Sequence, residues 1–366
     1  MSERKNFASE KKKEKNGNVY SFFNPDPEHI LQDSVQKRSI IPEQEEKVPT
    51  ANLSHLNDTL QKKFIQIFKE HPNIFSKNKH HLGHFTGFQV KALIDEDSPI
   101  KCRTPPRTRI LPDSCKKDIQ KYKTAGLFEL STGLQDKYCA NITLVRRSQN
   151  KAIKKETKAD KFINQQALKK TQKDTRPLPK APEDEASLFR MTIDFRALNK
   201  VSKNEKTTQL PSIQAIEHNL QGCHVSSFDL TNMYPSILLE KSSRNFFNFY
   251  VEDKIFTHAR LPQGWAPALS IAQQAMQFTF RDVTLLKFKQ DNKLCDDLFP
   301  YTSFSQFLQN FVDDICVWTK KSLSKPIETH LWCVKATFAA LEQAGFLISM
   351  QKSTFLDPVF TFLGLK

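Results

Sequence analysis

The chain has 366 residues, enough for two or three domains with a sizeable core, and only 38% of them are hydrophobic. Its formal net charge of +15 favours a nucleic acid partner over an acidic small molecule, unless the basic residues only solvate flexible tails. The seven cysteines include no Cys-x-x-Cys pair, which argues against a disulfide framework and a zinc finger and favours an intracellular setting. No apolar stretch is long enough to span a bilayer, which argues against a membrane protein.

The first part of the sequence combines polar stretches with two helical patterns. Residues 1–50 are polar and charged, which predicts a disordered tail. Apolar residues recur at every fourth position over 56–68, which predicts a helix. Residues 102–112 are rich in Pro and Arg and should run extended. A second helix is expected to follow, with Asp113 and Ser114 as its cap.

A polar insertion separates two predicted strands, 141–145 and 189–195. Residues 148–187, between them, are rich in Lys, Gln, Pro and Glu and lack a strong apolar rhythm. Two strands around such a segment predict a hairpin with an enlarged, mobile tip.

The second half of the chain alternates between apolar strands and amphipathic helices. The longest helical pattern should end at Gly345. The predicted helices are 268–280 and 327–341, and the predicted strands are 224–228, 246–251, 254–258, two strands within 308–318, 346–350 and 359–365.

Three aspartates follow apolar runs in this half of the chain. Asp229 ends one predicted strand, and Asp313 and Asp314 form an adjacent pair between two apolar runs. Carboxylates in such a pattern suit a phosphoryl-transfer site, where two divalent cations roughly 3.5–4 Å apart must be clamped. Mg²⁺ prefers oxygen ligands and keeps several waters, so two or three aspartates suffice. The alternative is a simple turn, as we expect for the Asp-Asp pair at 296–297.

Several short segments in one fixed order resemble the reverse transcriptases of retroviruses and LTR retrotransposons. The resemblance covers about residues 73–366, and the ordered set is more specific than any one segment. The segments are Arg-Met-Thr-Ile-Asp-Phe-Arg-Ala-Leu-Asn at 190–199, Ser-Phe-Asp-Leu at 227–230 with Tyr234, Leu-Pro-Gln-Gly at 261–264 with Trp265, Phe-Val-Asp-Asp at 311–314 and Phe-Leu-Gly at 362–364.

The resemblance implies an α+β fold, the right-hand polymerase fold with fingers and palm only, in which the palm is an antiparallel sheet backed by helices. Thumb and RNase H, which the family carries further on, are expected to be absent. The expected parts are a disordered tail at 1–50, fingers at 51–204 with the flexible basic insertion 148–187, palm at 205–236, fingers at 237–267, palm at 268–358 and the start of a primer-grip hairpin at 359–366.

The resemblance also implies a catalytic centre. Asp229, Asp313 and Asp314, with the carbonyl of Leu230, would hold two Mg²⁺ ions, with Mn²⁺ as an alternative ion. Lys352 would protonate the pyrophosphate leaving group. The ordinary reading of Lys352 is a solvated lysine at the end of a strand.

Four residues are implied in nucleotide binding. Arg190 and Arg147 would grip the triphosphate, for which a planar bidentate donor is suited. Tyr234 would exclude ribonucleotides by colliding with a 2′-hydroxyl, and Gln263 would line the pocket. The ordinary readings are surface arginines, a tyrosine that packs the palm and a common Pro-Gln-Gly loop.

The primer and template complete the implied contacts. Val312 would touch the primer terminus, and Phe362, Leu363 and Gly364 would grip its backbone. The implied partners are an RNA or DNA template with primer, deoxynucleoside triphosphates and further Pol domains (RNase H, integrase, protease) of the same element. The expected location is the cytoplasm, in a virus-like particle, or the nucleus.

Three functions remain open from the sequence. The first is an RNA- or DNA-directed DNA polymerase that extends a primer 3′-hydroxyl. The second is a catalytically inactive remnant that only binds nucleic acid, which the end of the chain soon after Gly364 favours. The third, an RNA-dependent RNA polymerase, is disfavoured by Tyr234. Separately, His80, His81 and His84 lie in a polar loop without a Cys pair, so we expect exposed imidazoles rather than a zinc site.

Overall fold

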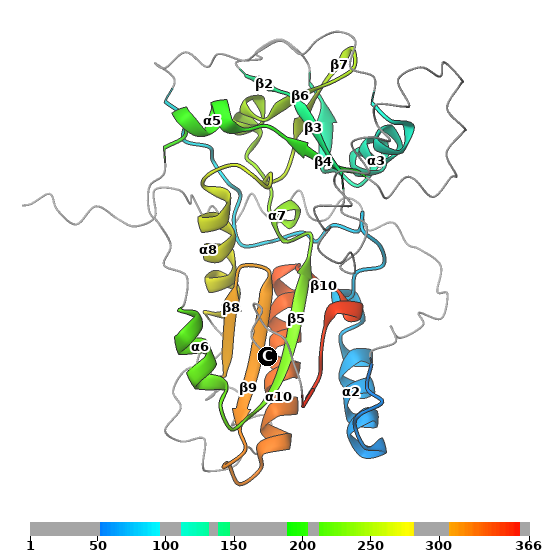
Figure 1. The fold of residues 1–366 in the computed structure, drawn as a ribbon, viewed down its shortest axis with the longest axis vertical. Helices are drawn as coiled ribbons and strands as arrows, with labels where there is room; N and C mark the ends of the chain where they lie inside the picture. The colour runs from blue at the N-terminus through cyan, green and yellow to red at the C-terminus, as the bar shows by residue number, and fades with distance from the viewer. Residues whose placement is uncertain are drawn as a thin grey trace, which may run out of the picture.

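The computed structural model describes residues 52–95, 111–131, 138–146, 189–203, 212–281 and 307–358. These residues form two lobes joined by a narrower middle, each with its own sheet (Figure 1). The predicted tail, the insertion 148–187 and the predicted strand 359–365 lie outside the described residues.

The lower lobe in Figure 1 contains an antiparallel sheet of order β10-β5-β9-β8. Its strands are β5 (Cys223–Thr231), β8 (Leu308–Phe311), β9 (Asp314–Lys320) and β10 (Leu347–Ile348). The exposure of β5 alternates along much of its length, as expected of a strand that packs one face on a core. This sheet matches the predicted palm architecture.

One long helix, α10 (Pro326–Ala344), backs the sheet and contacts β5 and β9. Pro326 occupies its first turn, where a missing N–H costs no hydrogen bond. The helix ends where predicted, at Gly345, which has φ of 82° in the left-handed region that glycine adopts without strain.

A second helix, α2 (Asp58–Glu70), packs on α10 through phenylalanine rings. Asn57 caps it, because its side-chain oxygen accepts a hydrogen bond from the Leu60 N–H at 2.9 Å. Phe68 stacks on Phe338 of α10, with ring centroids 6.2 Å apart. The predicted helix over 56–68 is confirmed, with its start two residues later.

The upper lobe contains a second sheet and a separate hairpin. The sheet has the order β1-β7-β6-β2, in which only β2 and β6 run parallel. Its strands are β1 (Phe128–Leu130), β2 (Cys139–Ala140), β6 (Asn248–Val251) and β7 (Lys254–His258). The hairpin pairs β3 (Ile142–Arg146) with β4 (Phe189–Ile193), as predicted.

Helices and single turns surround these sheets and fill the middle of the molecule (Figure 1). They are η1 (Pro72–Ile74), α3 (Asp113–Thr124), α5 (Arg196–Val201), α6 (Ile213–Leu220), α7 (Met233–Ser236), η4 (Lys241–Phe246), α8 (Ala268–Phe280) and η7 (Met350–Lys352). Over the described ranges, no helix is both long and apolar enough to cross a membrane.

Two local expectations were wrong. Pro112 rather than Asp113 or Ser114 occupies the N-cap position of α3, so Asp113 lies in the first turn, where its negative charge suits the helix dipole. The expected strand at 346–350 pairs only over β10, because the chain turns into η7 at Met350.

Candidate active site

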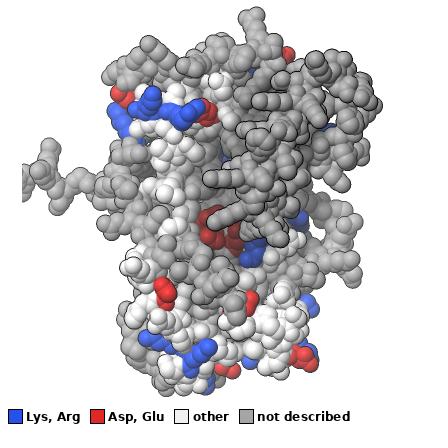
Figure 2. All heavy atoms as spheres, in the orientation of Figure 1, with Lys and Arg blue, Asp and Glu red and all other residues white. Residues whose placement is uncertain are grey.

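The three predicted carboxylates meet at one end of the β5–β9 strand pair. Asp229 and Asp314 are directly opposed in the antiparallel register, next to the buried pair of Phe228 and Ile315. The backbone carbonyl of Asp313 accepts a hydrogen bond from the Leu230 N–H at 2.8 Å. The register therefore brings together residues that are more than eighty positions apart in the sequence. In Figure 2 an acidic patch lies near the middle of the molecule, with basic atoms beside it.

A tight turn presents Asp313 to this end of the sheet. Phe311 and Asp314 pair across the turn, so only Val312 and Asp313 lie between β8 and β9. Val312 has φ of 57°, a left-handed conformation that is rare for a β-branched residue. Its N–H donates to the side-chain oxygen of buried Gln273, on α8, at 3.1 Å. This contact stabilises the strained turn, and sequence reasoning had assigned Gln273 no role.

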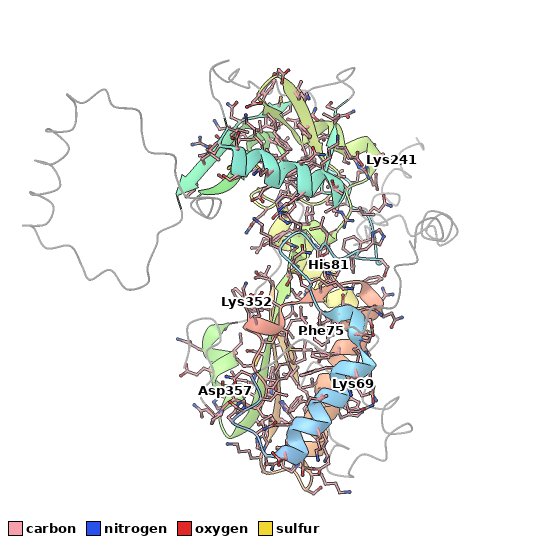
Figure 3. All side chains as sticks on the ribbon, turned by 90° about the vertical axis from the view of Figure 1, so that its right-hand side faces the viewer. Lys69, Phe75, His81, Lys241, Lys352 and Asp357 are labelled. Atoms are coloured by element: carbon pink, nitrogen blue, oxygen red, sulfur yellow. The ribbon has the colours of Figure 1, made fainter. Side chains whose placement is uncertain are left out.

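Lys352 lies beside the carboxylates on η7, which Figure 3 shows next to β5 between the two lobes. Its Nζ donates to both carboxylate oxygens of Asp229, at 3.0 and 3.2 Å. The chain reaches this place because the Ser349 N–H donates to the Asp229 carbonyl at 2.9 Å and Thr354 pairs with Ser227. The ammonium is largely exposed, so this is a contact that solvent and ligands can compete for.

The carboxylates repel one another. Partial burial raises the pKa of Asp313, and the negative charge of Asp229 raises it further, while Lys352 opposes the change. Burial likewise raises the pKa of Asp314, with added contributions from the charges of Asp313 and Asp229. Because the single positive charge of Lys352 cannot balance three carboxylates, excess negative charge remains at the end of the strand pair.

The donor set suits a hard divalent cation, although the side chains are not gathered around one. Among the described residues, no group of three or more His, Cys, Asp or Glu side chains is arranged to hold a metal ion. The chemistry of Asp229, Asp313 and Asp314 nonetheless fits Mg²⁺, because carboxylate oxygens are its preferred ligands and a cation would relieve their repulsion. Asp229 instead contacts Lys352.

Tyr234 lies close to the carboxylates on the short helix α7. Its side chain is half-buried, and burial together with the negative charge of Asp313 raises the pKa of its phenol. The preceding residue but one, Asn232, has φ of 53° and starts the helix. Its side-chain amide donates to the carbonyls of Lys79 and His81, both at 3.0 Å, which fixes α7 against a distant loop.

Arg260 ties α7 to two other segments. Its guanidinium donates to three backbone carbonyls, those of Gly83 at 2.7 Å, Pro235 at 3.0 Å and Gly126 at 3.1 Å. Burial, with a smaller effect from the positive charge of Arg244, lowers its pKa to about 10. Because Pro235 follows Tyr234 directly, this clamp fixes the backbone under the tyrosine. No pattern in the sequence indicated this role.

Gln263 lies in the predicted loop between β7 and α8, and its side chain is exposed. Gly264 follows with φ of 98°, a conformation that only glycine adopts readily. Trp265 is buried, with its ring edge-on to Phe247 and centroids 5.1 Å apart. The loop thus exposes Gln263 and is anchored by the buried side chain of Trp265.

The remaining predicted site residues are placed less fully. Arg190 pairs with Val145 in the β3–β4 hairpin, but only its backbone is described. The other predicted contacts, Arg147, Phe362, Leu363 and Gly364, lie outside the described residues.

The histidine loop is less exposed than predicted: of its three imidazoles only His84 is exposed, and the His80 side chain keeps 14% of its surface accessible. The Nε2 atom of His80 lies 3.3 Å from a carboxylate oxygen of Asp118, and its ring packs edge-on against Tyr122. The His81 Nδ1 accepts a hydrogen bond from the Lys77 N–H at 3.2 Å. These imidazoles make separate contacts rather than converging on one point.

The sequence and the fold both match known proteins. The sequence profile of the family described as "Reverse transcriptase (RNA-dependent DNA polymerase)" matches residues 169–366, more than half of the chain. An enzymatic polyprotein of Cassava vein mosaic virus is 29% identical over 188 residues, which are 51% of this chain and 25% of that polyprotein. The Pol polyprotein from transposon opus of Drosophila melanogaster is 26% identical over 189 residues, 51% of this chain and 16% of the relative. The chain thus matches a quarter or less of these polyproteins.

Solved structures show the same fold. The foamy viral protease-reverse transcriptase in complex with an RNA/DNA hybrid superposes with a TM-score of 0.58 at 19% identity, covering 86% of this chain and 33% of that one. A form of that protein in complex with double-stranded DNA gives a TM-score of 0.57 at 18% identity, covering 84% of this chain and 43% of that one. The predicted right-hand fold, with its antiparallel sheet backed by helices, is confirmed.

Proposed function

The chain belongs to the reverse transcriptase (RNA-dependent DNA polymerase) family, and on this premise we propose that it adds deoxynucleotides to a primer 3′-hydroxyl on an RNA or DNA template. The observation that carries the proposal is the strand register, in which Asp229 faces Asp314 and the turn holds Asp313 beside Leu230. Three acidic groups at one end of a sheet suit phosphoryl transfer better than they suit a structural role, because their repulsion destabilises the fold unless a cation binds.

The carboxylates and the Leu230 carbonyl are the proposed ligands of two Mg²⁺ ions, with Mn²⁺ as an alternative. The bound ions would activate the primer hydroxyl and neutralise charge on the departing pyrophosphate. The carboxylates contribute by holding charge at fixed positions on a rigid strand pair, which requires no rearrangement during reaction. Lys352, now paired with Asp229, is the proposed donor of a proton to the leaving group.

Nucleotide selection is assigned to four residues. Tyr234 would exclude a 2′-hydroxyl, since α7 is fixed by Asn232 and Arg260 and the ring cannot easily retreat. Gln263, exposed on its loop, would line the pocket. Arg190, on β4, and Arg147, which follows β3 in the sequence, would grip the triphosphate.

Primer and template contacts complete the proposal. Val312 adjoins the acidic pair and would touch the primer terminus, and Phe362, Leu363 and Gly364 would hold the primer backbone. RNase H, integrase or protease domains of the same element would act with this chain, in a cytoplasmic particle or in the nucleus. The division into fingers at 51–204 and 237–267 and palm at 205–236 and 268–358 remains a prediction.

Primer extension with Mg²⁺ on a homopolymer RNA or DNA template tests the proposal. We expect extension that depends on the metal and on a template that pairs with the added deoxynucleotide. Stable binding of template and primer without extension would instead favour the inactive remnant. Efficient use of ribonucleotides would favour an RNA polymerase.

A further inference from the structure

One side chain of helix α5 bridges the loop that carries Gln263. The Asn199 Nδ2 donates to the Gly264 carbonyl at 3.0 Å, and its Oδ1 accepts from the Ala266 N–H at 2.9 Å. The two contacts lie on either side of Trp265. We call residues 263–266 the pocket loop. A single carboxamide therefore closes a bridge across the pocket loop.

The chemistry of the bridge is specific to asparagine. A carboxamide carries a donor and an acceptor side by side, which is what a carbonyl and an N–H two residues apart require. Aspartate has no donor at neutral pH, so it would lose the bond to Gly264. Alanine would lose both bonds.

The residue directly after helix α5, its C-cap Ser202, holds the same loop. The Ser202 Oγ accepts a hydrogen bond from Trp265 Nε1 at 2.8 Å and donates to the Leu198 carbonyl, also at 2.8 Å. Contacts from α5 and its C-cap thus reach three successive residues of the pocket loop, positions 264, 265 and 266.

Helix α5 is itself firmly held. Leu198 is fully buried, and the chain after the helix pairs with residues 93–95 through two backbone hydrogen bonds. One joins the Asp95 N–H to the Val201 carbonyl at 2.8 Å, and the other joins the Lys203 N–H to the Leu93 carbonyl at 2.9 Å. The helix also follows β4 directly, so it connects the β3–β4 hairpin with the pocket loop.

The pocket loop needs such support because of its backbone. Gly264 has φ of 98°, and a Cβ there would meet no atom closer than 4.0 Å. Glycine in open space has many accessible conformations, so the loop gains freedom when its hydrogen bonds are removed. Gln263 is the neighbour of Gly264 and would move with it.

We propose that Asn199 is a positioning residue that sets nucleotide affinity by fixing the backbone on both sides of Trp265 and so aiming Gln263. The inference rests on the proposed function, in which Gln263 lines the nucleotide pocket. Asn199 would act through Gln263 and would not touch the reacting atoms. Its loss should therefore weaken nucleotide binding more than it slows the chemical step.

Ternary-complex formation tests this without any chemistry. With a dideoxy-terminated primer, the half-saturating concentration of the next deoxynucleotide measures pocket affinity directly. We expect Asn199→Ala to raise it roughly tenfold and Asn199→Asp to raise it less, because the bond to Ala266 is kept. Asn73→Ala is the matched control, since the exposed Asn73 side chain donates to Glu342 at 3.3 Å, its one side-chain hydrogen-bond partner within the described ranges and one remote from the pocket loop in sequence. Equal affinities of wild type and Asn199→Ala would overturn the inference.

A double-mutant cycle tests whether Asn199 acts through Gln263. In the Gln263→Ala background, Asn199→Ala should have little further effect on the half-saturating concentration. The reason is that the Gln263 side chain, which Asn199 is proposed to position, is absent from that background. Full additivity would overturn the inference. The single-turnover rate at saturating nucleotide should change less than affinity in Asn199→Ala, and a fall confined to that rate would also overturn it.

Hydrogen exchange of the pocket loop gives a readout independent of nucleotide. We expect the peptide over 262–267 to exchange faster in Asn199→Ala, because the Ala266 N–H loses its acceptor, with unchanged exchange in α10 as evidence of an intact fold. Unchanged exchange at the loop would contradict the inference. A wild type that forms the ternary complex but does not extend primers contradicts only the proposed function, whereas one that forms no ternary complex overturns both.

Discussion

The acidic centre (Asp229, Asp313 and Asp314) and the pocket loop are both parts of the proposed site, yet different contacts hold them. Asp229 and Asp314 are backbone partners in an antiparallel ladder, so their positions follow from the register of two buried strands. The pocket loop depends on side-chain hydrogen bonds from Asn199 and Ser202. Substitutions at the acidic centre should thus act on chemistry while the backbone stays in place. Substitutions behind the pocket loop should act through movement.

The largest expected effect comes from removing charge at the acidic centre. Asp313→Asn should lower the Mg²⁺-dependent rate of nucleotide addition by at least about 10²- to 10³-fold, the size seen when one electrostatic group for a transition state is lost. Template binding should persist, because the strand pair does not depend on this side chain. Single-turnover extension and a binding titration measure the two quantities. A near-normal rate would remove Asp313 from the site.

Substituting Lys352 tests whether an exposed side chain beside the β5–β9 strand pair contributes to the rate of nucleotide addition. Lys352→Met should lower the maximal rate by about 10²-fold, as for loss of a general acid, with little change in nucleotide affinity. Lys321→Met, at an exposed lysine after β9, is the matched control. Equal rates for the two variants would show that Lys352 is only a counterion of Asp229.

Tyr234 combines both kinds of contact, because it lies near Asp313 but on the helix α7, which side-chain hydrogen bonds from Asn232 and Arg260 hold in place. Tyr234→Ala should increase ribonucleotide use relative to deoxynucleotide use by roughly tenfold to a hundredfold, because the steric block is removed. The ratio of kcat/KM for matched ribo- and deoxynucleotides measures it. Tyr234→Phe keeps the ring and should keep the discrimination, so a change in that variant would point to the hydroxyl instead.

Two buried histidines extend the comparison to stability. His330, on α10, contacts the Ser226 hydroxyl at 2.7 Å and the Thr319 hydroxyl at 3.0 Å. His258, on β7, lies among Phe128 and other rings, and neither of its nitrogens has a hydrogen-bond partner among the described residues. His258→Phe should therefore raise the free energy of unfolding by about 1–3 kcal/mol, while His330→Phe should lower it by a similar amount. Urea unfolding at pH 7.5 measures both, and a loss of stability in His258→Phe would contradict this account.

The same histidines predict how stability depends on pH. Burial lowers the pKa of His258 and of His330 to about 3, whereas an exposed histidine titrates near 6.5. Between these values the unfolded chain binds protons that the folded chain does not, so stability falls as the pH drops from about 6.5 towards 3. Each histidine contributes up to about 1.4 kcal/mol per pH unit. His258→Phe should make the free energy of unfolding depend less steeply on pH in this range. An unchanged dependence would exclude His258 as a cause.

Local patterns predicted much of the fold. α8 and the end of α10 at Gly345 follow from apolar periodicity and a glycine stop. The predicted strands 246–251 and 254–258 form the β6–β7 hairpin, which turns at Glu252 in a left-handed conformation. No helix is predicted at the place of α5, because six residues are too few for a helical period to be recognised.

The parts of the site that sequence reasoning missed depend on contacts between distant segments. Asp229 and Asp313 could be identified because each ends or adjoins an apolar strand. Gln273 gave a weak signal, as a polar residue within an apolar helix. Arg260 gave none, because its three carbonyl partners are brought together only by the folded chain. That Asp229 contacts Lys352 was equally outside the reach of sequence patterns.

Iron-mediated cleavage tests most directly whether the three aspartates form one metal site. With hydrogen peroxide and ascorbate added, Fe²⁺ bound in place of Mg²⁺ would reduce the peroxide to hydroxide and a hydroxyl radical, which cuts the backbone beside the ligands. We predict cuts near both Asp229 and Asp313 in the same preparation, suppressed by excess Mg²⁺ and lost in Asp313→Asn. Cuts at neither position, or cuts that persist in Asp313→Asn, would contradict the account.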